Sequence, residues 1–234
     1  MSEADAPRQP RAGRWASKVY RLHVADEQRA HAFNVDGKRV AGPQQGFGPL
    51  WDRTYSVRIG AAATPEQVVA RWRVRFGDYW PRSGTFHGRI AALEAGDVSP
   101  LTAGGITTGV LVIYADDTSF SFITPEGHMF GGLITFSARD EGGTLVEIRM
   151  LVRTADPSWQ LLWPAIKPAE SWFWKGTLTN LAADHGVAVK DVDEVTVCVD
   201  PRPIWRNWRN LARNGAAATA VHALGRPFRR AARA

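Results

Sequence analysis

The chain has 234 residues, of which 44% are hydrophobic and 22% charged, a balance typical of a globular domain and not of a disordered or fibrous protein. Its single cysteine, Cys198, excludes an internal disulfide framework and a thiolate metal cluster, and it favours a reducing, cytoplasmic compartment. The net charge is +6, but residues 201–234 contain eight arginines and no acid, which leaves −2 for the rest of the chain. A near-neutral body argues against a nucleic-acid-binding fold.

The N-terminal region is predicted to supply an arm and an extension. Residues 1–18 have no apolar run, so we expect a mobile arm and no secretory signal. Residues 19–50 are expected to begin with short strands and to include a hairpin turn at Asp36-Gly37, because glycine accepts a positive φ. The longest uncharged stretch, residues 98–115, contains Thr, Gly and Pro and is rejected as a membrane span.

A loop, a strand and a short helix follow. Residues 42–51 contain three glycines and two prolines and are expected to form a structured loop. Alternation over residues 54–59 predicts a half-buried strand. Thr64 and Gln67 have the spacing of a capping box around Pro65, and they predict a helix of about three turns. Its apolar stripe comprises Val68, Val69, Trp72 and Phe76.

Residues 86–154 predict a run of antiparallel strands, because apolar-rich segments alternate with turns rich in Asp, Gly and Pro. In the last strand Val146, Ile148 and their alternate neighbours share one face, and charged residues share the other. One face of this sheet is therefore covered and the other is wet. The pair Gly131-Gly132 inside a strand predicts a bulge or a strong bend.

A long late helix is predicted at about residues 168–184, because Pro164 and Pro168 interrupt the helical pattern before it. Trp172 and Phe173 lie off the core stripe of this helix. They predict a second contact on its far side, with the tail or with a partner.

The order of elements (strand, short helix, antiparallel strands, long helix) predicts an α+β fold. Residues 51–186 resemble the START-like (Bet v 1-like, SRPBCC) superfamily, and the segment FSFITPEGHMFGGLITFSARDEGGTLVEIRMLV resembles an uncharacterised bacterial, in part actinobacterial, branch of it. The resemblance implies a curved antiparallel sheet wrapped around a long C-terminal helix, a helix grip. Outside it lie the arm (1–18), the N-terminal extension (19–50), an extra strand (187–200) predicted from alternating valines, and a basic tail (201–234).

The resemblance also implies a cavity between sheet and helix that holds an apolar or aromatic small molecule or a lipid. Aromatic rings fill ordinary cores as well, so a filled core is the favoured alternative for any single ring. For the whole set, a ligand pocket and a filled core are equal alternatives. The candidate lining residues are Trp72, Trp80, Phe120, Phe122, Phe130, Phe136 and Trp172.

Catalytic candidates are few. His128 follows a tight turn at a sheet end, two residues after Glu126, and an imidazole oriented by a carboxylate can act as a general base. The favoured alternative is a structural turn in which His128 caps a strand end. No spacing fits a metal site, a nucleotide loop or a nucleophile elbow. We therefore expect no metal and no cofactor, and we favour a binding protein over an enzyme.

The tail has the pattern of an interfacial helix. On a wheel begun at Ile204, apolar residues form one arc, arginines a second and asparagines a third. Packing of the Trp face back on the body, over Trp172 and Phe173, is an equal alternative, and nucleic-acid binding is a weaker one because the basic charge is confined to one segment. Contact with an anionic membrane would involve Trp205, Arg206, Trp208, Arg209, Leu211 and Arg213.

The sequence thus predicts a cytoplasmic protein that binds an apolar or aromatic small molecule or a lipid in an internal cavity. Reversible contact of its tail with the inner face of the membrane accompanies this function. The alternatives are a cyclase-type or dehydratase-type enzyme that uses the same cavity, and a structural protein with a filled core. The sequence leaves the oligomeric state open.

Overall fold

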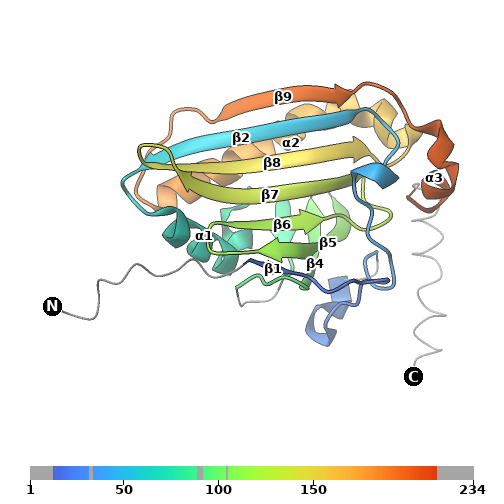
Figure 1. The fold of residues 1–234 in the computed structure, drawn as a ribbon, viewed down its shortest axis with the longest axis horizontal. Coiled ribbons are helices and arrows are strands. Elements are labelled where there is room, and N and C mark those ends of the chain that lie inside the picture. Colours follow the sequence, from blue (N-terminus) through green and yellow to red (C-terminus); the bar gives the residue numbers. More distant parts are fainter. Residues whose placement is uncertain (1–12, 32–33, 89–91, 104, 215–234) are drawn as a thin grey trace.

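The computed structural model describes residues 13–31, 34–88, 92–103 and 105–214 (Figure 1). They form one antiparallel sheet in the order β3-β4-β5-β6-β7-β8-β2-β9, with β1 beside β5. The strands are β1 (Arg14–Trp15), β2 (Leu50–Gly60), β3 (Gly84–Phe86), β4 (Val98–Ala103), β5 (Ile106–Ala115), β6 (Ser119–Ile123), β7 (Phe130–Asp140), β8 (Thr144–Thr154) and β9 (Asp193–Asp200). The α-helices are α1 (Pro65–Val74), α2 (Pro157–Asp184) and α3 (Trp208–Asn214), and the 3-10 helices are η1 (Asp26–His31), η2 (Pro43–Gln45), η3 (Phe76–Tyr79) and η4 (Trp205–Asn207).

Helix α1 begins where the sequence predicts. The hydroxyl of Thr64 accepts a hydrogen bond from the N–H of Gln67 at 3.4 Å, and the Gln67 side chain accepts one from the N–H of Thr64 at 2.9 Å. The buried Trp72 turns the apolar stripe of the helix towards the sheet, although Phe76 falls in the following 3-10 helix. The predicted capping box and stripe are confirmed.

The predicted run of antiparallel strands is also confirmed. Strands β7 and β8 pair in continuous register from Phe130 opposite Thr154 to Asp140 opposite Thr144. The alternate residues of β8, Val146 to Val152, are buried on the inner face of the sheet, which α2 crosses. The fold is therefore the α+β helix grip that the sequence predicts.

The glycine pair of β7 does not form a bulge, which was one of the two alternatives that we predicted. The register against β8 is unbroken at Gly131 and Gly132, and the loop that contains η2 crosses the strand there. A Cβ at Gly131 would lie 2.8 Å from the carbonyl oxygen of Gly42 and 3.0 Å from the nitrogen of Gly46. Glycine is therefore required for the close approach of this loop, which is structured as predicted.

Helix α2 is longer than predicted, because Pro164 and Pro168 lie inside its 28 residues and do not end it. Both prolines are on the exposed side. A residue and the one four positions before it share one side of a helix, so the carbonyl groups left without an N–H partner, such as that of Gln160, face water. The helix begins instead at Asp156, whose carboxylate accepts the N–H three residues later at 2.9 Å.

The N-terminal extension differs from the prediction. Its described residues before β2, which begins at Leu50, form only a single bridge between Val40 and Pro125, and η1 occupies part of the segment expected to contain strands. Leu22, Val24 and Val35 pack instead against Leu111 on the outer face of β5, where they make a second small core. The apolar residues of this segment are thus buried by side-chain packing, without the backbone hydrogen bonds of a β-strand. The tight turn at Gly37 is present, with φ +80°.

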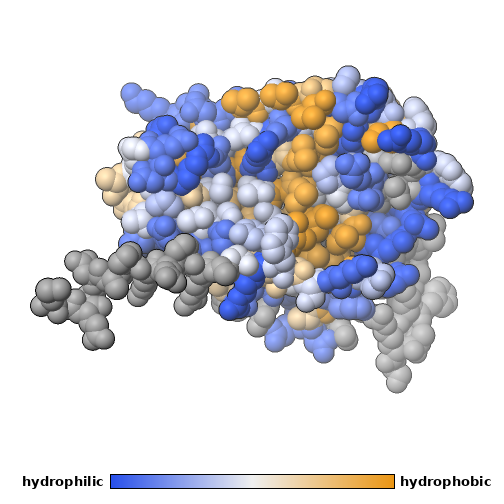
Figure 2. All heavy atoms as spheres, in the orientation of Figure 1, coloured by the Kyte–Doolittle hydropathy of each residue, from blue (hydrophilic) through white to orange (hydrophobic). Residues whose placement is uncertain are grey.

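Strand β9 confirms the extra strand and leaves its valines on the outside. It pairs with β2, and Val195 and Val197 are 61% and 52% exposed. An apolar band crosses this outer face (Figure 2). Leu151 and Leu133 are direct cross-strand neighbours in β8 and β7, and both alternate with residues of the inner face.

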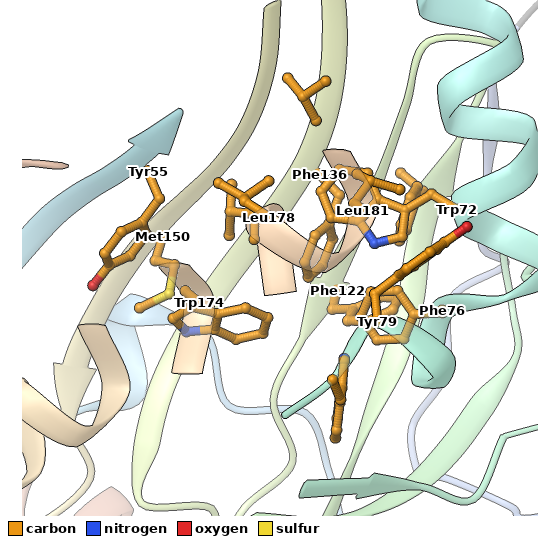
Figure 3. Packing of buried hydrophobic residues seen from close by; sticks show 14 of the residues in the cluster. Tyr55, Trp72, Phe76, Tyr79, Phe122, Phe136, Met150, Trp174, Leu178 and Leu181 are labelled. Atoms are coloured by element: carbon orange, nitrogen blue, oxygen red, sulfur yellow. The ribbon is translucent and has the colours of Figure 1, made fainter. Parts of the chain in front are cut away.

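Aromatic rings fill the core beneath the second half of α2 (Figure 3). The ring of Trp72 lies 5.8 Å from that of Phe120 and 5.3 Å from that of Phe136, edge to face, which is a favoured arrangement. Phe120 and Phe136 stack at 4.8 Å. Leu178 and Leu181 of α2 complete this core and are fully buried.

Replacement of the central ring tests this packing. Trp72→Ala should lower the free energy of unfolding by about 3–5 kcal/mol, because it removes a fully buried ring and leaves a cavity. Val74→Ala is the control on the same helix, since Val74 is 53% exposed, and it should change stability by less than about 0.5 kcal/mol. Urea denaturation measures both, and similar small effects would contradict the assigned core.

Candidate functional site

The structure places the seven predicted lining residues in different surroundings. Trp80 packs edge-on against Phe173 at 5.1 Å, and Phe130 against Trp163 at 5.5 Å. Trp172 is 60% exposed on the outer side of α2, so it does not line the interior; its neighbour Phe173 packs inwards instead. The other four rings pack against one another in the core: Trp72, Phe120, Phe122 and Phe136.

The first half of α2 contacts the sheet less than the second half does. Of residues 157–173, all of them described, only Trp163 is buried, whereas five residues from Trp174 onward are buried. The Trp163 ring lies 6.5 Å from the ring of Trp51 and 5.5 Å from that of Phe130. We call the interior bounded by Trp51, Tyr55, Phe130 and Trp163 the Trp163 region.

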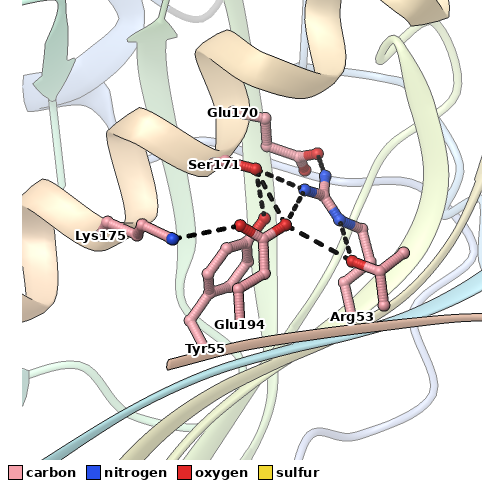
Figure 4. Close-up of polar contacts among 7 residues, drawn as sticks. Arg53, Tyr55, Glu170, Ser171, Lys175 and Glu194 are labelled. Atoms are coloured by element: carbon pink, nitrogen blue, oxygen red, sulfur yellow. Dashed lines mark hydrogen bonds and ion pairs between the residues drawn. The ribbon is translucent and has the colours of Figure 1, made fainter. Parts of the chain in front are cut away.

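A buried ion cluster ties the Trp163 region together (Figure 4). The guanidinium of Arg53, on β2, is fully buried and donates hydrogen bonds to the carboxylate of Glu170 and to the hydroxyl of Ser171, the latter at 2.7 Å. It also donates to Glu194 of β9 at 3.0 Å. Its charge lies 5.5 Å from the centre of the Trp163 ring. One side chain therefore joins β2, α2 and β9.

Arg53 is not among the site residues predicted above, although the sequence contains a signal for it. Arg53 is two residues before Tyr55, so it belongs to the inward-facing register of β2 together with Tyr55 and Val57. A charged residue on the buried side of an alternating strand predicts a buried partner. The partners are far away in sequence, on α2 and on β9, which is why spacing did not reveal them.

Burial controls the charges of this cluster. Burial raises the pKa of Glu170 to about 7, and the nearby guanidinium of Arg53 opposes that rise. Burial also acts to raise the pKa of Glu194, but hydrogen bonds from Arg53 and Ser171 outweigh it and leave the pKa below its usual range. The pKa of Tyr55 is raised, mainly by burial. The two carboxylates that share Arg53 thus have different tendencies to hold a proton.

The structure does not bring Glu126 to His128. Glu126 forms an ion pair with Arg39 at 3.1 Å, while Nδ1 of His128 accepts a hydrogen bond from the N–H of Phe130 at 3.0 Å. Burial lowers the pKa of His128 to about 4, so the ring is neutral and carries its proton on Nε2. A backbone N–H, not a carboxylate, sets the tautomer. This geometry is that of the structural turn, with the ring at the start of β7.

The tail docks on the body at a different place from the one considered in the sequence. The N–H of Ile204 donates to the carbonyl of Phe47 at 2.8 Å, and the Trp205 ring packs edge-on against Phe47 at 4.6 Å. Arg153 donates to the carbonyl of Arg202 at 3.1 Å. The contact is therefore with the loop before β2 and not with Trp172.

Docking leaves much of the tail exposed. Trp205 and Trp208 are 65% and 63% exposed, and Leu211 is partly buried. Trp205 belongs to η4 and Trp208 begins α3; the two follow each other without a break, so the predicted helix after Ile204 is present, with a 3-10 first turn. Residues 215–234 lie outside the described part of the chain. None of the described helices is long and apolar enough to cross a membrane.

A groove of about 500 Å³ lies on the opposite, outer face of the sheet. Its charged lining is paired internally, since Asp52 binds Arg149 and Arg139 binds Glu147. Val195 and Val197 of β9 form its upper wall. The groove is polar and distinct from the interior where the sequence predicts a ligand.

No family model and no curated protein matches this chain. Solved structures resemble part of the chain at low identity. Protein TTHA0849 from Thermus thermophilus is 20% identical with a TM-score of 0.44 and covers 56% of this chain and 96% of its own. The di-domain ARO/CYC protein StfQ from the steffimycin biosynthetic pathway is 11% identical with a TM-score of 0.43 over 59% of this chain, which spans 53% of StfQ. Ara h 8.0201 is 13% identical with a TM-score of 0.39 over 57% of this chain and 97% of its own.

Glu170 should make stability depend on pH. Its pKa is about 7 in the folded protein against 4.5 for the free group, so its contribution to the free energy of unfolding is complete below pH 4.5 and is lost as pH rises through 7. Glu170→Gln removes this dependence. The difference in free energy of unfolding, variant minus parent, should therefore rise between about pH 5 and pH 8 in urea denaturation.

Subtracting the parent cancels the pH dependence that other titrating groups give to the free energy of unfolding. His128 is one of them, and its lowered pKa makes stability rise with pH, opposite to the effect of Glu170. Glu66→Gln is the matched control, because Glu66 is exposed on α1. This exposed substitution should change the free energy of unfolding by less than about 0.5 kcal/mol. A flat difference for Glu170→Gln would contradict the raised pKa.

Proposed function

We propose that the protein binds an apolar or aromatic small molecule or a lipid in the Trp163 region, beneath the first half of α2. The observation that carries the proposal is that Trp163 alone is buried among residues 157–173, over an interior of aromatic rings. Apart from Trp163 and the Arg53–Glu170 pair, the first half of α2 has few buried contacts with the sheet, and we infer that this half is a cover that can move.

The polar groups of the interior suggest what the ligand carries. The indole N–H groups of Trp51, Trp72 and Trp80 are buried, and none has an acceptor among the described residues. An unpaired buried donor costs about 1–3 kcal/mol, so buried donors normally have partners. The N–H of Trp51 belongs to the Trp163 region. A ligand with an apolar body and an oxygen acceptor fits these groups.

The first half of α2 has fewer backbone hydrogen bonds than an uninterrupted helix, and one buried ion pair holds it to the sheet. Pro164 and Pro168 each remove one backbone hydrogen bond from the first half of α2. The ion pair of Arg53 with Glu170 holds the same segment to the sheet. Opening of the segment would break this pair and admit a ligand next to Trp163.

An enzyme of the cyclase or dehydratase type is the second candidate. The raised pKa of Glu170, about 7, favours it, because a group that titrates near neutral pH inside a cavity can give or accept a proton. Glu170, not His128, would be the acid–base residue. Glu170→Gln then leaves ligand retention intact and abolishes turnover.

Ligand binding can be tested with the two tryptophans of α2. Trp163→Ala should weaken binding of the apolar fluorescent probe N-phenylnaphthylamine about tenfold or more, because it removes a ring that faces the ligand; tenfold corresponds to about 1.4 kcal/mol. Trp172→Ala is the control, since this ring is 60% exposed on the same helix. Trp163→Phe, which keeps a ring, should bind nearly as well as the parent.

Native mass spectrometry of the gently purified parent should also show a co-purifying apolar species. Equal or tighter probe binding by folded Trp163→Ala would place the ligand elsewhere. Absence of both probe binding and a co-purified species would favour the filled core.

We also propose that the tail makes reversible contact with the anionic inner face of the cytoplasmic membrane. Trp205 and Trp208 are exposed beside Arg206, Arg209 and Arg213, all of them exposed. Tryptophan suits the membrane interface, and each arginine near an anionic surface adds about 1 kcal/mol of attraction. Together, the two tryptophans and three arginines predict weak membrane binding that is reversed by added salt.

Cosedimentation with vesicles tests the tail. Trp205→Ala/Trp208→Ala should reduce binding to vesicles that contain phosphatidylglycerol, and binding by the parent should fall as salt is added, because salt screens the arginines. Trp15→Ala is the control, since Trp15 is 73% exposed on β1. Equal binding to neutral and anionic vesicles would remove the electrostatic part of the proposal.

A further inference from the structure

We infer that the outer side of the first half of α2 is a second membrane-contact surface, which docks on the same anionic bilayer as the tail. We call it the α2 face and define it by Leu161, Leu162, Ala165, Ala169 and Trp172. The inference rests on the proposed membrane contact of the tail for the identity of the occupant. It concerns a different segment and can fail independently.

The α2 face is apolar and exposed. Leu161, Leu162 and Trp172 are 81%, 50% and 60% exposed, and Ala165 and Ala169 between them are exposed too. Leu161, Ala165, Ala169 and Trp172 follow one another at helical spacing, so they form one stripe about 17 Å long at 1.5 Å per residue. The prolines of α2 also lie on this exposed side and add no charge.

The opposite side of the same segment is apolar as well. Trp163 is buried against the sheet, and Ile166 packs against the same core. The Arg53–Glu170 pair also lies on this inner side, so the exposed apolar stripe on the outer side is the part of the segment that remains for a partner. Single exposed leucines need no explanation, but two adjacent leucines in line with a tryptophan form a contiguous patch.

The α2 face and the tail lie at the same end of the molecule, where α3 is close to the start of α2 (Figure 1). Gly48 is in close contact with the side chain of Gln160, in the first turn of α2. The residue before Gly48, Phe47, packs against Trp205. One loop thus connects the two surfaces, and they can reach a common plane.

Charge identifies the occupant as an anionic surface. Lys167 on the flank of α2 and the tail arginines Arg202, Arg206, Arg209 and Arg213 give this end five cations. The acids in segments 154–172 and 198–214 are all engaged within the fold: Asp156 caps α2, Glu170 pairs with Arg53, and Asp200 pairs with Arg153 and Arg202. An apolar patch with cations beside it matches the interior and the headgroups of an anionic bilayer.

A double substitution that introduces negative charge tests the α2 face. Leu161→Glu/Leu162→Glu should lower the partition coefficient onto phosphatidylglycerol–phosphatidylcholine vesicles at least tenfold, because it removes apolar area and introduces repulsion. The matched control is Val195→Glu/Val197→Glu, two exposed apolar residues on the outer face of β9, and it should bind as the parent does. Circular dichroism confirms that each variant is folded.

A label gives a second readout that does not depend on stability. Cys198 is the only cysteine, so Cys198→Ser with Ala165→Cys places one environment-sensitive fluorophore on the α2 face. Its emission should shift to the blue when anionic vesicles are added. The same label at Thr179→Cys, exposed in the second half of α2, should not shift.

The outcomes separate the two membrane contacts. If Trp205→Ala/Trp208→Ala loses vesicle binding while Leu161→Glu/Leu162→Glu keeps it and the Ala165 label does not shift, the tail binds alone and the inference is overturned. If the leucine variant instead changes the sedimentation coefficient of the protein without vesicles, the α2 face is an interface between copies of the chain, which also overturns it.

Discussion

The buried guanidinium of Arg53 is the contact on which the arrangement of this protein depends. It is fully buried and joins three segments that are distant in sequence: β2, α2 through Glu170 and Ser171, and β9 through Glu194. Loss of one partner of such a buried ion pair typically costs about 3–5 kcal/mol, because it leaves a charge without compensation. The strand that extends the sheet and the first half of the helix that crosses it are thus held by one side chain.

The interior has two parts that differ in how they hold α2. Beneath the second half of α2, Trp72, Phe120 and Phe136 pack ring against ring. Beneath the first half, Trp163 and the Arg53 cluster are the main contacts. The same helical segment has the proposed ligand on its inner side and the proposed bilayer on its outer side. A ligand that enters there would come from the lipid phase.

The fold could be predicted because its signals are local. The capping box at Thr64, the alternation of β8 and the valines of β9 each depend on neighbours within a few residues, and each was confirmed. Errors arose where tertiary contacts outweighed local preference. Pro164 and Pro168 are tolerated because they face water, and Gly131 serves a loop that crosses β7 and not a bulge. The apolar residues around Leu22 pack on β5 without forming a ladder.

The site could be predicted only in its residue types. By itself the sequence determined that aromatic rings gather in the helix grip and that Trp and Arg share the tail, because composition and periodicity are carried by the chain. The tertiary structure alone decided which rings fill the core, that Trp172 points outwards, that Glu126 pairs with Arg39 and not with His128, and that Arg53 meets Glu170. These facts depend on which segments pack together across long separations in sequence, 87 residues for Arg39 and Glu126 and 117 for Arg53 and Glu170, and no local pattern encodes that choice.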